Sequence, residues 1–168
     1  MIEILGACVE KILSQASPQE IAQLLEDVDP YPGAVEFLEG IKSYEYETYI
    51  ITDNPLAGLA EIKEVLKEKL PVEEIYSTTQ IDEETLTIKG YVPKSEIFKT
   101  IYENFDSLPK KLLGVVQGKN DIPLAYEIKR YDGILIVANS NSKELKKLAD
   151  YCVASTGELP KILEKIEL

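Results

Sequence analysis

Leu112-Leu113-Gly114-Val115-Val116-Gln117-Gly118-Lys119-Asn120-Asp121-Ile122-Pro123 is the stretch that decides the fold. Its first five residues are apolar and predict a buried strand. The Gly-Lys-Asn-Asp centre predicts a tight loop, and the residues that follow predict a helix. In open α/β sheets, ligand sites lie beyond the carboxyl ends of the strands. Asn120 and Asp121 are therefore either simple turn formers or polar groups at a ligand site, and this stretch alone leaves both interpretations open.

The same alternation of strand and helix occurs on both sides of this stretch. We expect strands at residues 48–52, 74–77, 112–116, 134–137 and 151–154. Helices are expected at residues 34–42, 56–70, 94–104, 123–129 and 159–166, with a further helix capped by Asn141 or Ser142. Strands that alternate with helices predict a mostly parallel, Rossmann-like α/β sheet with helices on both faces. A small β-hairpin is expected at residues 79–92.

The N-terminal part has a different pattern. Residues 4–28 carry apolar side chains at helical spacing, and Ser17-Pro18-Gln19-Glu20 divides them with an N-cap, a proline at the first helical position and a glutamate at the third. Pro30-Tyr31-Pro32-Gly33 is a break. We therefore predict a helical segment at residues 1–29, which looks like the remnant of a cap, and a Rossmann-like core at residues 30–168.

Composition limits the possible functions. The chain has 168 residues, 45% of them hydrophobic, and no apolar run approaches the ~20 residues that span a membrane. The first residues lack the features of a signal peptide, so we expect a cytoplasmic protein with no membrane association. The net charge of −12 argues against sequence-independent nucleic-acid binding. It is compatible with a small phosphorylated ligand held by backbone amides and one lysine.

The residue types available restrict the chemistry. Histidine is absent, which excludes imidazole bases and histidine metal ligands. Cys8 and Cys152 are two thiols and do not form a disulfide framework. Any reaction must therefore use carboxylates, hydroxyls, amides and lysine.

Three groups of polar residues fall at predicted strand ends or helix starts. Thr52-Asp53-Asn54 follows a buried strand and is either an N-cap or a cradle for an anion. Lys94 is the first residue of a predicted helix, where the helix dipole favours anions. It is either an ordinary solvated surface charge or a cation that neutralises an anionic group. The third group is the loop from Gln117 to Asp121.

This order resembles that of the haloacid dehalogenase (HAD) superfamily, and within it the phosphoserine phosphatase group. The resemblance covers residues 31–168. Ile50-Ile51-Thr52 is similar to motif II, Lys94-Ser95-Glu96 to motif III, and the stretch from Val115 to Pro123 to motif IV. Leu86-Thr87-Ile88-Lys89-Gly90 is similar to the hairpin that precedes motif III.

The resemblance implies roles for particular residues. Thr52 would hydrogen-bond a phosphoryl group, with Asp53, Asn54 and Asn120 completing the phosphate-binding cradle. Lys94 would neutralise the phosphate, and Asp121 would support the loop and the lysine; these two are the catalytic candidates. An active member of the family would be a phosphoric monoester hydrolase that uses Mg²⁺, for which Asp121 is a weak candidate ligand.

Two departures from the family pattern are as informative as the matches. The family nucleophile lies in an Asp-x-Asp motif that closes the first strand, and this chain has no such segment. Asp27-Val28-Asp29 fits the Asp-x-Asp pattern, but it follows a helical pattern and directly precedes Pro30. We therefore reject it as the nucleophile motif. In motif IV, Gln117 stands where the family has its Mg²⁺-binding aspartate, and a neutral amide is a poor ligand for a hard cation. Cys8 has no cationic setting that would make it a substitute nucleophile.

Three hypotheses follow. The chain is a HAD-like protein without hydrolase activity that retains a phosphate site, or an incomplete phosphatase whose nucleophile strand lies upstream or on a partner, or a structural subunit. Enzymatic activity is left open. The missing central strand would leave a gap between the strands that end at Thr52 and Val116. It could be closed by pairing these strands directly, by inserting residues 2–5, or by borrowing a strand in a homodimer or from a partner chain.

Overall fold

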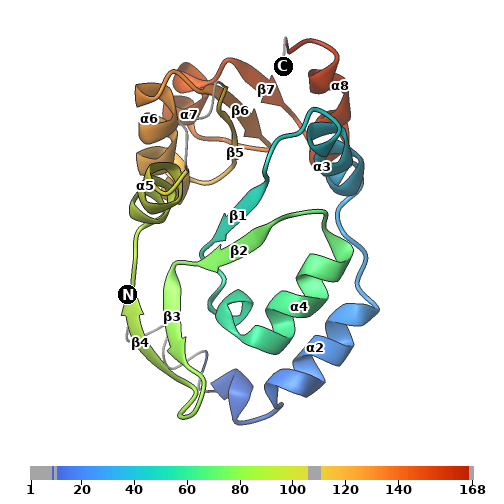
Figure 1. The fold of residues 1–168 in the computed structure, drawn as a ribbon, viewed down its shortest axis with the longest axis vertical. Coiled ribbons are helices and arrows are strands. Elements are labelled where there is room, and N and C mark those ends of the chain that lie inside the picture. The colour runs from blue at the N-terminus through green and yellow to red at the C-terminus, as the bar shows by residue number, and fades with distance from the viewer. Residues whose placement is uncertain (1–8, 10, 106–110, 167–168) are drawn as a thin grey trace. The chain divides into compact units, whose positions relative to one another are not determined.

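The computed structural model describes residues 9, 11–105 and 111–166 and has a mixed α/β fold with small parallel and antiparallel sheets (Figure 1). Contacts divide the chain into two compact units, which are described one at a time. Unit 1 comprises Met1–Pro30 and Glu47–Pro93, and unit 2 comprises Tyr31–Tyr46 and Lys94–Leu168. The chain passes from unit 1 to unit 2 after Pro30, one residue from the predicted boundary between residues 1–29 and 30–168. It passes between the units again after Tyr46 and after Pro93.

Unit 1 packs two helices and two small sheets. Its elements are α2 (Pro18–Glu26), β1 (Tyr49–Thr52), a 3-10 helix (Pro55–Gly58), α4 (Ala60–Lys69), β2 (Glu74–Ser77), β3 (Thr79–Asp82) and β4 (Thr87–Tyr91). Strands β1 and β2 pair in parallel, and β3 and β4 form the predicted antiparallel hairpin. Helices α2 and α4 contact each other around a core of Ala22, Leu59, Ile62 and Val65.

Local signals placed α2 correctly and α4 only in part. The Ser17 hydroxyl accepts the Glu20 N–H, and the Glu20 carboxylate accepts the Ser17 N–H, so the predicted capping box is confirmed. The prediction of one helix over residues 56–70 is wrong at its start. The Asn54 side chain accepts the Leu56 N–H and begins a 3-10 turn, and Leu59 is then extended (ψ 136°). This break directs the Leu59 side chain into the core, where it is fully buried.

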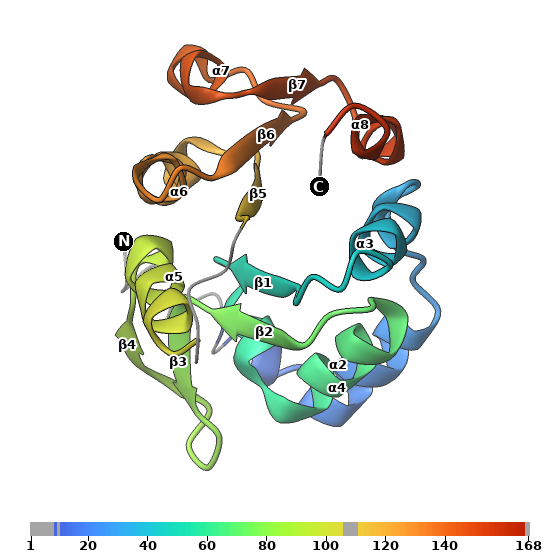
Figure 2. The same cartoon turned by 45° about the horizontal axis from the view of Figure 1, so that its top comes forward.

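Unit 2 is a three-layer arrangement around a parallel sheet (Figure 2). Its elements are α3 (Ala34–Lys42), α5 (Lys94–Glu103), β5 (Leu113–Val116), α6 (Ile122–Arg130), β6 (Ile134–Ala138), α7 (Lys143–Leu148), β7 (Tyr151–Val153) and α8 (Pro160–Leu163). The strands are parallel in the order β5-β6-β7. Helices α3 and α8 pack on one face of the sheet, and α6 and α7 contact the other. Ser142 caps α7, as one of the two predicted alternatives.

A close backbone contact holds α3 in unit 2. Gly33, the residue before α3, has φ +80°, a conformation that glycine adopts without strain. A Cβ atom at Gly33 would lie 2.7 Å from Gly157 Cα and 2.8 Å from the Thr156 carbonyl oxygen. The approach places Phe37 and Ile41 of α3 in the same apolar cluster as Ile136 of β6.

The expected α/β class is confirmed. The finer expectation of one Rossmann-like sheet stays a prediction. The described strands form three small sheets, β1-β2 and β3-β4 in unit 1 and β5-β6-β7 in unit 2. Direct pairing of the strands that end at Thr52 and Val116 would join the two units and stays a prediction. Residues 2–5 and Cys8, which bear on the other ways to fill the central position, lie outside the described residues. No helix among the described residues is long and apolar enough to cross a membrane.

Candidate functional site

Lys94 and Asp121 form a largely buried ion pair within unit 2. Lys94 is the first residue of α5 and directly follows Pro93. Its Nζ lies 2.7 Å from Asp121 Oδ1. The side chains are only 14% and 10% exposed, respectively. The cation that the sequence places at an unfavourable helix position therefore has a specific anionic partner, 27 residues further along the chain.

Asp121 also closes the loop that follows β5. After Val116 the chain turns through a short 3-10 helix before α6 begins at Ile122. Asp121 Oδ2 accepts hydrogen bonds from the backbone N–H groups of Gln117 and Gly118, both at 2.9 Å. The carboxylate thus receives three donors, two from the backbone and one from Lys94.

The electrostatics of Asp121 follow from these contacts. Burial alone would raise the pKa of its carboxyl group, but the hydrogen bond from Lys94 and those from Gln117 and Gly118 outweigh burial, so the pKa is below its ordinary value. Asp121 is therefore ionised at neutral pH. The neighbouring side chains of Gln117, Lys119 and Asn120 are exposed.

The second predicted group, in unit 1, forms a hydrogen-bonded turn. The Thr52 hydroxyl accepts the Asn54 N–H at 3.1 Å, and the Asn54 side chain accepts the Leu56 N–H at 3.1 Å. Asp53 Oδ1 accepts the hydroxyl hydrogen of the fully buried Thr78, also at 3.1 Å. The capping interpretation is confirmed for Asn54. The cradle interpretation stays open, because a hydroxyl that accepts a bond keeps its hydrogen and Thr52 can still donate to an anion.

Sequence reasoning missed the hydroxyls at the end of β2. The Ser77 hydroxyl donates to the Asn54 carbonyl oxygen and accepts the Thr79 N–H, so it ties the ends of β1 and β2 together. The signal was available, because three consecutive hydroxyl residues, Ser77, Thr78 and Thr79, begin at the last residue of a predicted strand, where Thr52 also lies. Of the predicted residues, the structure brings Lys94 and Asp121 into contact, with Asn120 in the same loop; Thr52, Asp53 and Asn54 belong to unit 1.

The residues at this loop fit Mg²⁺ poorly. A carboxylate offers about four lone-pair positions, and three of those on Asp121 already accept hydrogen bonds. The remaining one is on Oδ1, which lies against the Lys94 ammonium group, and that charge repels a second cation. Gln117 can supply only a neutral oxygen. Across residues 9, 11–105 and 111–166, no group of three or more Cys, Asp or Glu side chains is placed to hold a metal ion.

The chain was compared with protein-family models and with curated proteins. No protein-family model matches the chain, and no curated protein matches it.

Proposed function

We propose that this chain is a HAD-like, phosphatase-related protein that binds a small phosphorylated ligand and has no hydrolase activity of its own. The ion pair between Lys94 and Asp121, at the carboxyl end of β5, carries the proposal. It joins residues from two of the three motifs whose order led to the resemblance, and it lies where ligands bind in parallel α/β sheets.

The absence of hydrolysis is argued from the chemistry available. Hydrolysis through an aspartyl-phosphate needs a nucleophile and a metal ion that offsets charge repulsion. Asp121 has its oxygens engaged by three donors, and Gln117 is neutral. Lys94, which is paired with Asp121, and the exposed polar side chains of Lys119 and Asn120 are groups that suit binding. Thr52, Asp53 and Asn54 belong to unit 1, and their contact with phosphate stays a prediction of its own.

The direct test is the effect of inorganic phosphate on thermal unfolding of the full chain. A ligand at about ten times its Kd stabilises the folded state by ~1.4 kcal/mol, which raises the Tm by roughly 3 to 6 °C in a protein of this size. We expect such a rise for the parent protein and its loss in Lys94→Ala. Thr52→Val should reduce it.

Lys129→Ala is the matched control. Lys129 is also paired with an aspartate, Asp150, at 2.8 Å, and both residues lie in unit 2. Its partner precedes β7 and accepts the Leu135 N–H near the amino end of β6, away from the loop after β5. Lys129→Ala should keep the phosphate response. A parent protein whose Tm is unchanged by phosphate, or one that turns over p-nitrophenyl phosphate with Mg²⁺, would refute the proposal.

A further inference from the structure

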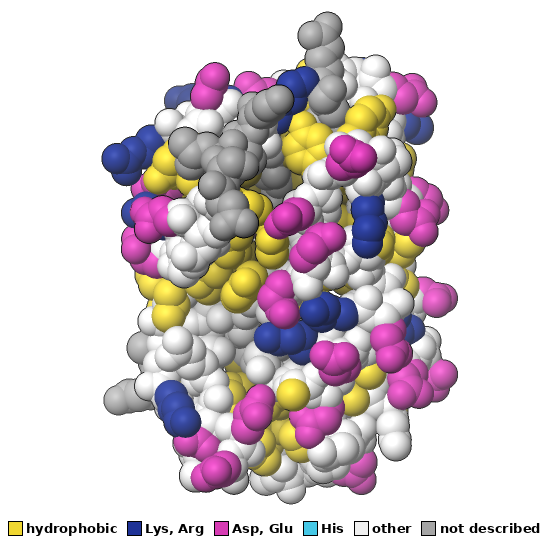
Figure 3. Space-filling model, viewed as in Figure 1, with side chains coloured by type: hydrophobic (Ala, Val, Ile, Leu, Met, Phe, Trp, Pro, Cys, Tyr) yellow, Lys and Arg dark blue, Asp and Glu magenta, His cyan; other side chains and the backbone are white. Residues whose placement is uncertain are grey.

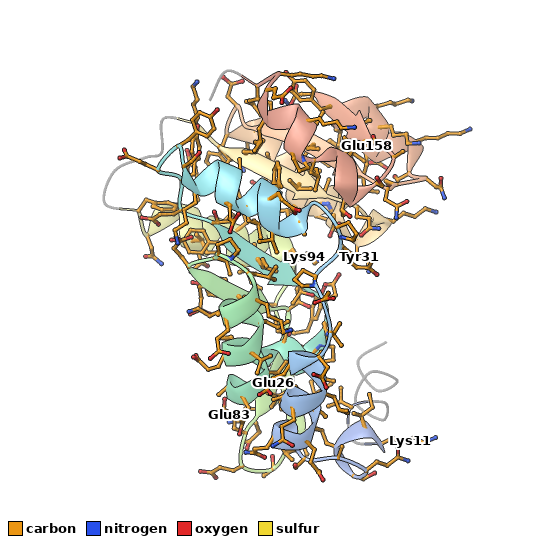
Figure 4. All side chains as sticks on the ribbon, turned by 90° about the vertical axis from the view of Figure 1, so that its right-hand side faces the viewer. Lys11, Glu26, Tyr31, Glu83, Lys94 and Glu158 are labelled. Carbon is orange, nitrogen blue, oxygen red and sulfur yellow. The ribbon has the colours of Figure 1, made fainter. Side chains whose placement is uncertain are left out.

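Unit 2 is assembled from two separate parts of the chain. The first part, Tyr31–Tyr46, carries α3, and the second part, Lys94–Leu168, carries the sheet and the other helices of the unit. Figure 4 labels Tyr31 and Lys94, the residues with which the two parts begin. At both of its ends the first part continues into unit 1. Residues 1–93 therefore contain all of unit 1 together with α3.

A single short connection joins residues 1–93 to residues 94–168. Only Val92 and Pro93 lie between the end of β4 and the start of α5. When this connection takes a different course, α3 of one copy can pack on the sheet of another copy, with the same contacts inside unit 2. Such an exchange of identical elements is a low-cost route to a dimer, and short hinge loops favour it.

The contacts of α3 are specific and lie with residues far along the chain. Phe37 and Ile41 are each 5% exposed and belong to the apolar cluster that contains Ile136 of β6. Gly40 lies against α8, because a Cβ atom there would be 2.4 Å from Leu163 Cδ1. A helix of nine residues is too short to be stable in water by itself. The helical form of α3 therefore depends on this face of unit 2, which in turn needs α3 to cover it.

We propose that the face of unit 2 formed by β6, β7 and α8 is a docking surface for α3 of a second copy of this chain, and that the protein forms a dimer by reciprocal exchange of this helix. The exchanged element is a helix, so this dimer differs from one made by a borrowed strand. Closed monomer and exchanged dimer share the same contacts within unit 2. Protein concentration during folding therefore decides between them.

Refolding of the parent protein at two concentrations tests the exchange. The dimer should be a major species after refolding at about 1 mM, the order of the effective concentration of the chain's own α3, and roughly a hundredth as abundant after refolding at about 10 µM. Sedimentation velocity directly after dilution measures the fraction, since an exchanged dimer returns to monomers only when unit 2 opens. Monomers alone after both refolding reactions would overturn the proposal.

Cross-linking tests whether α3 is the exchanged element. In a background with Cys8→Ser and Cys152→Ser, one chain carries Gly40→Cys and the other Leu163→Cys. After joint refolding at the higher concentration and dilution, a disulfide should join these chains at least about ten-fold more often than chains with Gly40→Cys and Lys147→Cys, because a disulfide needs closely placed Cα atoms. Lys147 is exposed on α7, which contacts the other face of the sheet. Equal yields for the two pairs would overturn the proposal.

The connection itself provides a test that leaves α3 unchanged. Insertion of Gly-Ser-Gly between Pro93 and Lys94 lengthens the hinge, which favours the closed monomer, so the dimer fraction should fall several-fold. The same insertion between Glu83 and Glu84, in the turn of the β3–β4 hairpin, is the matched control and should leave the fraction unchanged. A dimer fraction that the hinge insertion does not lower would overturn the proposal, and this variant decides in case Gly40→Cys prevents folding. None of these results depends on the phosphate response, which alone decides the proposed function.

Discussion

At the scale of single residues, the charges at the loop after β5 are balanced within the protein. Lys94 and Asp121 neutralise each other in a setting that is mostly removed from water. Removing one member of such a pair leaves the other buried without a partner, which costs more than the pair itself contributes. The two side chains should therefore be energetically coupled.

We predict that Lys94→Met lowers the free energy of unfolding by about 3 kcal/mol, because Asp121 is left as a buried charge without its cation. The double variant with Asp121→Asn should lose less than the sum of the two single variants. Urea unfolding followed by circular dichroism measures all three. Lys129→Met, which breaks a more exposed pair, should cost about 1 kcal/mol or less. Additive losses at Lys94 and Asp121 would show that the pair is not coupled.

The lowered pKa of Asp121 sets a direction for the effect of pH. Its pKa in the folded state is below the ordinary value of 3.8, so its stabilising contribution is fully present above that value and is lost as the pH falls through the lower, folded-state pKa. The stability difference between the parent protein and Asp121→Asn should stay constant from neutral pH down to about pH 4 and shrink below it. A difference that has already vanished at about pH 6 would contradict this assignment.

At the scale of helices and strands, backbone geometry fixes where α3 begins. Gly33 has a positive φ and approaches Gly157 closely. Gly118, at the loop after β5, has φ −94°, and a Cβ atom there would lie 3.9 Å from the nearest atoms beyond its chain neighbours. The two glycines therefore form a matched pair for substitution.

Gly33→Ala should lower the free energy of unfolding by at least about 1 to 2 kcal/mol, because the left-handed conformation is strained for alanine and its Cβ would collide with the backbone of Gly157. Gly118→Ala should change it by no more than about 0.5 kcal/mol. Chemical denaturation of both variants under the same conditions measures the difference. Equal costs would mean that the close approach at Gly33 is not maintained in solution.

Sequence patterns located most of these elements because the signals are local. The spacing of Val35, Phe37, Leu38 and Ile41 predicted α3 with the bounds that it has, and the capping box predicted the start of α2. The break at Leu59 was missed, since a buried leucine fits a helical pattern as well as an extended residue does. The strand pairs within each unit could not be predicted, because a strand's own residues do not state which strand it pairs with.

The candidate site was predictable to a similar degree. Residue type and position at strand ends singled out Lys94, Asp121 and Thr52 without any contact information. The convergence of donors on Asp121 was not predictable from these residues, since it depends on the turn that brings the Gln117 and Gly118 N–H groups to one oxygen. The role of Ser77 in joining β1 and β2 required the strand register.

At the scale of the whole molecule, each unit has its own core. One apolar cluster gathers Phe37 and Ile41 with residues of β6, β7 and α8, and another gathers Ala22, Leu59, Ile62 and Val65. Each cluster lies within one unit. The surface is acidic, and Figure 3 shows Asp and Glu side chains scattered over the face in view, with fewer Lys and Arg among them.

Separate cores predict separate responses to core mutations. Phe37→Ala should cost about 3 to 5 kcal/mol in unit 2, and Ile62→Ala about 2 to 5 kcal/mol in unit 1. Amide hydrogen exchange at β6 should accelerate more in the first variant, and exchange at α4 more in the second. Equal acceleration at both places in each variant would mean that the units unfold as one.

The discontinuity of unit 2 also has a consequence for synthesis of the chain. Tyr31–Tyr46, which includes α3, leaves the ribosome before Lys94–Leu168, and Glu47–Pro93 of unit 1 comes between them. At ~5–20 residues per second, that intervening segment alone takes roughly 2 to 9 s to make. During this time Phe37 and Ile41 have no sheet to cover, because the β6 residue in their cluster, Ile136, has not yet been made. Unit 1 can acquire its fold on the ribosome, whereas unit 2 must wait for β6 and β7.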